Sequence, residues 1–313
     1  MELNSRITSF GRHETFPLRY GWLPKGYEAI TKDAAALQHP ERAMVELGVG
    51  RNMVNAIQYW LQTTGVIEIK DGSARTTELG QTIFDFDGDP YLEDDATLWL
   101  LHWLIAANAE RATGFFWFFN RFASPRFRDK DLVEALTDFV TNELQQTKRS
   151  QNTLKSDISA LVRMYAATPG RNDEHLDSPL ADLGLIEPDP EAGYRSMRTT
   201  QPFLPTVALH FALAQRFAAE SEQQPALPVR TLLYGDDRKA APGAAFRLSE
   251  EGFMERLEAV LADYPGSYEL RDTAGVNQIY RGSELQEPLA ILRDYYASGY
   301  YTGKKTSSGS RRS

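Results

Sequence analysis

Two helical stretches joined by a glycine-rich turn, residues 40–65, restrict the fold of this chain more than any other part of the sequence. Pro40 suits the first turn of the helix PERAMVEL, because the N–H that proline lacks would have no partner there. LGVG then makes a tight turn with two glycines. RNMVNAIQYWLQTTG is expected to be a longer helix, since its apolar residues recur at spacings of three and four. This order is typical of a helix-turn-helix.

The stretches on either side extend this unit. Residues 22–38 precede it and are expected to form a first helix. After Gly65, VIEIK is expected to be a short strand, DGS a hairpin-type turn, and TTELGQTIF a helical turn that a threonine can cap. The order helix, helix, glycine turn, helix, strand, turn predicts a winged helix-turn-helix.

Polar side chains lie along one face of the helix that begins at residue 51. They are separated by four, three and four positions: Arg51, Asn55, Gln58 and Gln62. Arg, Asn and Gln match the hydrogen-bonding edges of guanine and adenine, and an α-helix fits the major groove of DNA. The predicted DNA contacts are therefore this face with Asn52, together with Lys70 and Arg75, which bracket the hairpin turn and can reach phosphates. A solvated face, or one that packs on another protein, would show the same pattern.

The opening segment, FGRHETFPLRYGW (residues 10–22), gathers chemically active side chains in a stretch that Pro17 keeps from forming a regular helix. Hydrolysis of a phosphodiester needs a base for water, donors for the developing negative charge, and a proton for the leaving oxygen. Glu14 or His13 can supply the proton steps. Two arginines can clamp a phosphate through forked hydrogen bonds. The predicted catalytic residues are Arg12, His13, Glu14 and Arg19.

A structural interpretation of the opening segment is also open. Networks of ion pairs gather the same residue types. The charged groups would then pair with one another and fix the N-terminus to the helices, with Phe10, Phe16 and Tyr20 as anchors. Residue types alone favour this interpretation over catalysis.

The middle of the chain, residues 89–172, is expected to be a helical block. DATLWLLHWLIA and TGFFWFFNRF are apolar and aromatic enough to be buried core helices. Two amphipathic helices are expected to follow at residues 129–147 and 151–166. ATPGRND is expected to be a linker that closes the block.

The C-terminal part is expected to mix helices with short strands. It opens with a helix–strand–turn–strand order, and residues 268–281 suggest a strand followed by a short helix. The last twelve residues carry four basic and no acidic side chains and are expected to be disordered. The overall prediction is a mainly α, α+β chain in four parts: residues 1–88, 89–172, 173–301 and 302–313.

The charge distribution limits where a nucleic acid can bind. The net charge is −9, and residues 85–120 carry seven acidic and one basic side chain, so a nucleic-acid surface must be local. The absence of cysteine excludes disulfides and thiolate chemistry. No apolar run reaches the roughly 18–20 residues of a membrane span, and the N-terminus does not resemble a secretory signal, so a cytoplasmic protein without a membrane partner is expected.

The acidic run DFDGDPYLEDD raises the question of a metal site. An EF-hand is excluded, because Pro90 and Ala96 replace its glycine and its bidentate glutamate. A magnesium ion held by acids at residues 89, 93 and 94 is the weaker interpretation, and a helix start favoured by the helix dipole is the stronger one. His102 and His210 lie in apolar stretches and are expected to be core histidines. Phosphate-loop, dinucleotide-binding, nucleophile-elbow and zinc-protease motifs are absent.

Four stretches together resemble a bacterial family, formerly a domain of unknown function, that is associated with DNA phosphorothioation and includes SspB-type DNA nickases. They are FGRHETFPLRYGWLPKG, LGVGRNMVNAIQYWL, DPYLEDDATLWLLHW and ATGFFWFFNRF, and the resemblance covers residues 10 to about 280. Its most specific part is the FxxHETFxxR pattern, present here as Phe10, His13, Glu14, Thr15, Phe16 and Arg19.

The resemblance implies a role in a modification-based phage-defence system. A nick in one strand would give sulfur-inserting partners access to the backbone of double-stranded DNA; these partners are a cysteine desulfurase, an ATPase and an ATP-pyrophosphatase. A chain without cysteine cannot carry persulfide sulfur itself. A DNA-nicking endonuclease, with Mg²⁺ as a candidate cofactor, is therefore the predicted function. The alternatives are a non-catalytic DNA-binding or targeting subunit, a transcriptional regulator, and an interaction scaffold.

Overall fold

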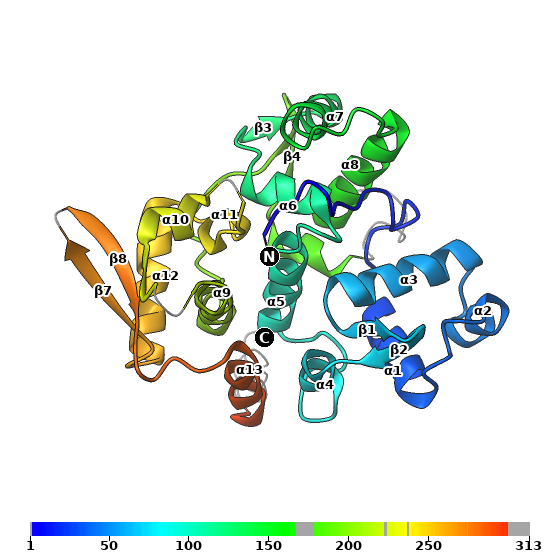
Figure 1. Ribbon diagram of the computed structural model, residues 1–313, viewed down its shortest axis with the longest axis horizontal. Helices are drawn as coiled ribbons and strands as arrows, with labels where there is room; N and C mark the ends of the chain where they lie inside the picture. Colours follow the sequence, from blue (N-terminus) through cyan, green and yellow to red (C-terminus); the bar gives the residue numbers. More distant parts are fainter. Residues whose placement is uncertain (1, 167–177, 222–223, 237, 274, 300–313) are drawn as a thin grey trace, which may run out of the picture.

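The computed structural model describes residues 2–166, 178–221, 224–236, 238–273 and 275–299. Its architecture is mixed α+β, with many helices and three small antiparallel sheets. Helix α5, Asp95–Ala106, lies at the centre, with the N-terminal helices on one side and the C-terminal helices on the other (Figure 1). Among the residues that the structure describes, no helix is both long and apolar enough to cross a bilayer.

The N-terminal unit contains the helices and the hairpin that the sequence predicts. Its elements are α1 (Trp22–Lys32), α2 (Pro40–Leu47), α3 (Arg51–Thr63), β1 (Ile67–Lys70), β2 (Ser73–Thr76) and α4 (Glu78–Phe84). The β1–β2 turn consists of Asp71 and Gly72, both with positive φ (52° and 77°), the geometry that twisted two-residue hairpins prefer. Thr77 caps α4 by accepting the Gly80 N–H at 3.0 Å, as expected.

Helix α1 is shorter than expected. It ends at Lys32, because Asp33 is extended (φ −150°, ψ 109°) and its side chain accepts the N–H of Ala35. An Asx-type bond of this kind offers the backbone an alternative to another helical turn.

The central block packs apolar helices against one another. Asp94 caps α5 by accepting the Ala96 N–H, and α6 (Thr113–Asn120) follows after a short connection. Trp99, Phe119 and Tyr165 surround the buried ring of His102, so this histidine belongs to the core, as predicted.

The helix expected over residues 129–147 is interrupted. Regular α-helix α7 covers Asp129–Asp138, and a π-helical turn, η1, covers Phe139–Glu143. Helix α8 then runs from Gln151 to Tyr165, within one residue of the prediction. The expected linker after it lies outside the described residues.

The C-terminal part contains more elements than the sequence predicts. They are η3 (Pro179–Leu183), β4 (Glu187–Asp189), β5 (Gly193–Arg195), α9 (Thr206–Ala218), β6 (Ala226–Pro228), α10 (Val229–Tyr234), α11 (Pro242–Ala245), α12 (Glu250–Asp263), β7 (Tyr268–Thr273), β8 (Val276–Arg281) and α13 (Pro288–Ala297). Strand β5 pairs with β4 and with β3 (Arg126–Phe127), so one small sheet joins the central block to the C-terminal part. The tail from residue 302 lies outside the described residues.

A strand followed by a short helix was expected at residues 268–281; the strand is present as β7, and the helix is a wrong prediction because β8 takes its place. Strands β7 and β8 form an antiparallel hairpin, and β8 also pairs with β6 in the order β6–β8–β7 (Figure 1). Ile279 is fully buried in this sheet, so pairing with a distant strand decides the conformation of the GVNQIY stretch.

Candidate nucleic-acid interface

The opening segment lies between α3 and α8, and both helices hold its backbone (Figure 1). The indole Nε1 of Trp60 on α3 donates a hydrogen bond to the carbonyl oxygen of Phe16 at 3.2 Å. On the other side, the N–H of Gly11 donates to Oδ1 of Asp157 on α8 at 2.7 Å. A Cβ atom at residue 11 would lie 2.8 Å from Cγ2 of Thr153, and φ there is 71°, so glycine permits this close approach to α8.

The imidazole of His13 is buried against both helices. Its Nε2 donates to Oδ1 of Asp157 at 2.7 Å, and the ring stacks on Trp60 with a centroid separation of 6.1 Å. Only 1% of His13 is exposed, and its Nδ1 atom has no hydrogen-bond partner among the described residues. His13 therefore fixes the opening segment from inside and does not present its ring to the surface.

A strained turn follows His13. The Phe16 N–H donates to the His13 carbonyl at 2.8 Å, and the two central residues, Glu14 and Thr15, have φ values of 50° and 70°. Neither residue is a glycine or an asparagine, so both occupy a left-handed conformation that costs free energy. The turn places Oε1 of Glu14 3.5 Å from Nδ2 of Asn55 on α3. The carboxylate of the opening segment thus meets the polar face of α3.

The two arginines of the opening segment have different environments. Arg12 is exposed and forms no ion pair with any described residue. Arg19 is half-buried, and its guanidinium lies 5.9 Å from the ring centre of Phe16 and 5.4 Å from that of Trp22. Arg12 is thus the more accessible of the two cations, while Arg19 stacks on the aromatic anchors.

The polar face of α3 is exposed at its N-terminal end and partly covered further on. Arg51, Asn52 and Asn55 are exposed, whereas Gln58 and Gln62 are half-buried. Gln62 donates through Nε2 to the carbonyl oxygen of Gln58, so its amide is turned toward its own helix.

Both basic residues of the hairpin are exposed, as a phosphate contact requires. Lys70 pairs with Ser73 across the turn, and Arg75 lies opposite Glu68. The structure thus brings one predicted site residue, Glu14, into contact with α3, keeps Arg51 and Lys70 accessible, and encloses His13.

Two residues that shape this surface were not predicted from the sequence. Asp157 is separated from His13 by 144 positions, and the apolar periodicity of α8 says nothing about what its one acidic side chain contacts. Arg163, further along α8, donates to the carbonyl oxygen of Thr15 at 3.4 Å. The one available signal was the position of Asp157 three residues after Leu154 and four before Leu161, on the apolar side of the helix.

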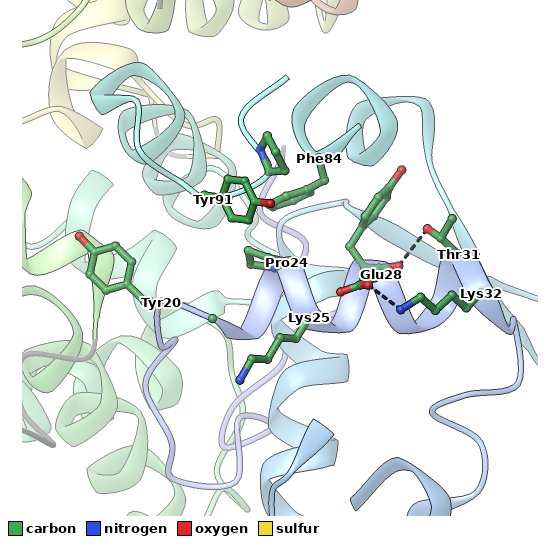
Figure 2. Close-up of a pocket in the computed structure, with 11 residues that line it drawn as sticks. Tyr20, Pro24, Lys25, Glu28, Thr31, Lys32, Phe84 and Tyr91 are labelled. Carbon is green, nitrogen blue, oxygen red and sulfur yellow. Dashed lines mark hydrogen bonds and ion pairs between the residues drawn. The ribbon is translucent and has the colours of Figure 1, made fainter. Parts of the chain in front are cut away.

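A pocket of about 590 Å³ lies on the outer side of α1, away from these contacts. Figure 2 shows Phe84 and Tyr91 facing α1, with Glu28 and Lys32 paired along the helix. None of the residues predicted for DNA binding or catalysis lines it. Tyr20 and Gly21, at the end of the opening segment, line this pocket, but the candidate interface is the surface around His13, Glu14 and α3, which its lining does not include.

Comparison with known proteins identifies the family. A family model described as "Protein of unknown function (DUF4007)" matches residues 10–296. The chain belongs to the DUF4007 family. Its match begins at Phe10, the first residue of the FxxHETFxxR pattern. No curated protein matched this DUF4007 chain.

Two solved structures share the fold of this DUF4007 chain. One, described as "Magnesium ion-bound SspB crystal structure", is 26% identical with a TM-score of 0.83, and the alignment covers 95% of this chain and 91% of that chain. The other, described as "SspB crystal structure", is 24% identical with a TM-score of 0.77, and the alignment covers 95% of each chain. The SspB-like fold therefore extends over nearly the whole chain.

The magnesium ion of the first neighbour prompts a test of this DUF4007 chain's own residues. Within the described residues, no group of three His, Asp or Glu side chains can hold a metal ion. In the acidic run, Asp89 accepts the N–H groups of Glu93 and Asp94, and Asp94 accepts the Tyr295 hydroxyl. These acids lie at the start of α5 and accept hydrogen bonds there, as expected from the interpretation that the sequence favoured over a magnesium site. The described residues do not fit a preformed magnesium cage; magnesium bound by one carboxylate takes most of its ligands from water or phosphate.

Proposed function

We propose that this protein binds duplex DNA and nicks one strand, within a bacterial DNA phosphorothioation system. Helix α3 would lie in the major groove, and the β1–β2 hairpin would act as the wing of a winged helix, with Lys70 and Arg75 on phosphates. The opening segment would then face the backbone beside the groove. The family resemblance of the opening motif and the SspB-like fold support this context.

One observation carries the proposal: the Glu14 carboxylate lies 3.5 Å from the Asn55 amide of α3. A carboxylate with a role in hydrolysis has to be near the scissile phosphate, and α3 is the element with the side chains and shape for reading bases. Because Glu14 and α3 are in contact, one bound duplex can present its bases to α3 and a backbone phosphate to Glu14. Exposed Arg12 lies two residues before Glu14 in the sequence and would supply a guanidinium to the phosphate.

The roles of the opening segment follow from its burial. Glu14 would accept a proton from the water that forms the new P–O bond, while the bond to the leaving sugar oxygen breaks and that oxygen takes up a proton from solvent. Arg12 and Arg19 would donate hydrogen bonds to the non-bridging oxygens as negative charge develops. His13 is a positioning residue, since its ring is enclosed and bonded to Asp157. The strained turn at Glu14 and Thr15 is typical of functional sites, where packing maintains an unfavourable backbone.

Plasmid nicking tests the catalytic part. Wild-type protein with supercoiled plasmid and magnesium is expected to produce open circles, and Glu14→Gln, which keeps the shape but not the basicity, is expected to be at least about 100-fold slower. Glu134→Gln, at an exposed position on α7, is the matched control and should nick like wild type. Plasmid that stays supercoiled, or relaxes equally with Glu14→Gln, contradicts the nicking role. A parallel reaction with EDTA asks whether the wild-type activity needs a divalent ion.

A non-catalytic targeting subunit is the second candidate, and one observation favours it. Of the two groups proposed for proton transfer, His13 is enclosed, which leaves Glu14 alone. In this role the protein would bring the cysteine desulfurase, the ATPase and the ATP-pyrophosphatase to DNA. It predicts DNA binding that depends on Arg51 and Asn55, with supercoiled plasmid unchanged by wild-type protein.

A further inference from the structure

We infer that the exposed side of α8 is a second DNA contact, which binds backbone phosphates of the same duplex. This α8 basic face consists of Lys148, Arg149, Asn152, Lys155, Ser159 and Arg163. The inference rests on the proposed DNA binding and extends it, because none of these residues belongs to α3, the hairpin or the opening segment.

The spacing of the α8 basic face is that of one helix surface. Asn152, Lys155, Ser159 and Arg163 follow one another at three, four and four positions, and Lys148 and Arg149 come just before the first turn. All are exposed except Arg163, which is half-buried. From residue 152 to 163 the helix rises roughly 16 Å. This is enough to reach more than one phosphate, since phosphates follow at about 3.4 Å of helix axis per strand.

No carboxylate among the described residues neutralises the charges on this face. Residues 144–166 contain four cations and one acid, Asp157, which is buried and bonded to Gly11 and His13. Within the described residues none of the four cations forms an ion pair, whereas Arg195, Arg238 and Arg271 of the C-terminal part all do. An uncompensated group of cations on a chain of net charge −9 is the local basic surface that DNA binding requires.

The α8 basic face is continuous with the opening segment. Arg163 donates to the Thr15 carbonyl, next to Glu14. At the other end, the guanidinium of Arg149 lies 5.4 Å from the ring centre of Phe10, and its Nη2 donates to the Thr8 hydroxyl at 3.1 Å. Exposed Arg12 lies between these two contacts in the sequence. The opening segment thus has polar α3 on one side and basic α8 on the other, and a duplex over the segment would meet both.

The chemistry of the face favours DNA over a membrane. The large apolar residues of α8, Leu154, Ile158, Leu161 and Met164, are all buried, so the exposed side has no group to insert among lipids. It also lacks the exposed aromatic anchors that dominate protein–protein interfaces. Lysine, arginine, serine and asparagine are the side chains that contact phosphates and position a protein on a duplex.

The test measures the salt dependence of binding to a labelled duplex of about 30 base pairs, roughly three helical turns. Lys148→Ala/Lys155→Ala is expected to weaken binding roughly tenfold for any DNA sequence and to reduce the slope of log affinity against log salt by about 2. Both lysines are exposed and without hydrogen-bond partners among the described residues, so the fold should be kept. Lys148→Arg/Lys155→Arg should bind like wild type. Lys130→Ala, an exposed lysine on α7, is the control for loss of a charge elsewhere.

The outcomes of this test distinguish failure of the α8 contact from failure of the proposed DNA-binding function. If wild-type protein does not bind the duplex, the proposed function and the inference both fail. If wild type binds and Arg51→Ala/Asn55→Ala loses affinity, but the α8 double variant keeps the wild-type affinity and slope, only the inference is overturned. If the α8 double variant binds DNA like wild type but no longer binds phosphatidylserine vesicles that wild type binds, the face contacts a membrane surface. This result would also overturn the inference.

Discussion

The Nε2 atom of His13 lies 2.7 Å from Oδ1 of Asp157, and both side chains are buried. The same carboxylate oxygen accepts the N–H of Gly11 at 2.7 Å. One acidic group on α8 therefore determines the path of the backbone immediately before Glu14. His13 and Asp157 therefore have a structural role in holding the opening segment against α8.

Removing Asp157 should destabilise the protein. Asp157→Ala leaves the Gly11 N–H and the His13 Nε2–H buried without an acceptor, and we expect a loss of about 2–3 kcal/mol in the free energy of unfolding. Urea unfolding followed by circular dichroism measures this loss. Asp87→Ala, at an exposed position without a hydrogen bond among the described residues, should change stability by less than about 0.5 kcal/mol. Equal stability of Asp157→Ala and wild type would show that this contact does not hold the segment.

A glycine at position 15 should stabilise the fold. Thr15 is exposed and has a φ of 70°, which is costly for a β-branched residue and free of strain for glycine. The relief of strain exceeds the entropy that glycine adds to the unfolded chain, so Thr15→Gly is expected to raise the free energy of unfolding by about 1 kcal/mol. Thr147→Gly, at an exposed threonine outside the positive-φ residues, should lower it instead. Destabilisation in both variants would argue against strain at Thr15.

Local rules account for the parts of the fold that the sequence predicted. Helix α3 follows from apolar spacing, and the cap at Thr77 follows from a short polar side chain before a helical run. The β1–β2 hairpin follows from the Asp-Gly turn. Helix α13 was not predicted. It begins with Pro288 in its first turn, and a proline in the first turn is also the signal that predicted α2.

Long-range contacts account for what the sequence did not show. Strand β8 depends on β6, whose partners lie about fifty residues earlier in the chain, as in the pair Leu227 and Ile279. The enclosure of His13 depends on Asp157, and no spacing rule connects the two positions. For the candidate site, residue types selected Glu14 and the polar face of α3 as separate candidates. They did not predict the contact between Glu14 and Asn55, and they could not distinguish a histidine ring that faces solvent from one that faces the core.

Acid should weaken the fold through His102. Its Nε2 donates to the Ala245 carbonyl, so its Nδ1 accepts from the Tyr165 hydroxyl, and burial lowers the pKa of the ring from 6.5 to about 3. Below pH 6.5 the imidazole of His102 binds a proton in the unfolded chain but stays neutral in the folded chain, so the free energy of unfolding falls as pH falls. Between pH 6.5 and pH 5 this amounts to about 2 kcal/mol.

Urea unfolding at pH 7 and pH 5 checks this dependence. His102→Gln should be less stable than wild type at pH 7, because it loses a packed ring, but should lose about 2 kcal/mol less on going to pH 5. His39→Asn, at an exposed position before α2, should keep the wild-type pH dependence. The same loss in His102→Gln and wild type would mean that another group causes the acid sensitivity.

Two single substitutions separate base reading from phosphate contact on the N-terminal unit. Asn55 is exposed on α3 and can pair with both hydrogen-bonding atoms of an adenine edge, so Asn55→Ala is expected to cost about 1–3 kcal/mol on preferred duplexes and to alter their ranking. Lys70, at the exposed end of β1, is proposed to contact a phosphate, so Lys70→Ala should weaken all duplexes alike and reduce the salt slope by about 1. Affinity measurements over a panel of duplexes at two salt concentrations distinguish these patterns. An equal loss on every sequence for Asn55→Ala would mean that α3 contacts the backbone and does not read bases.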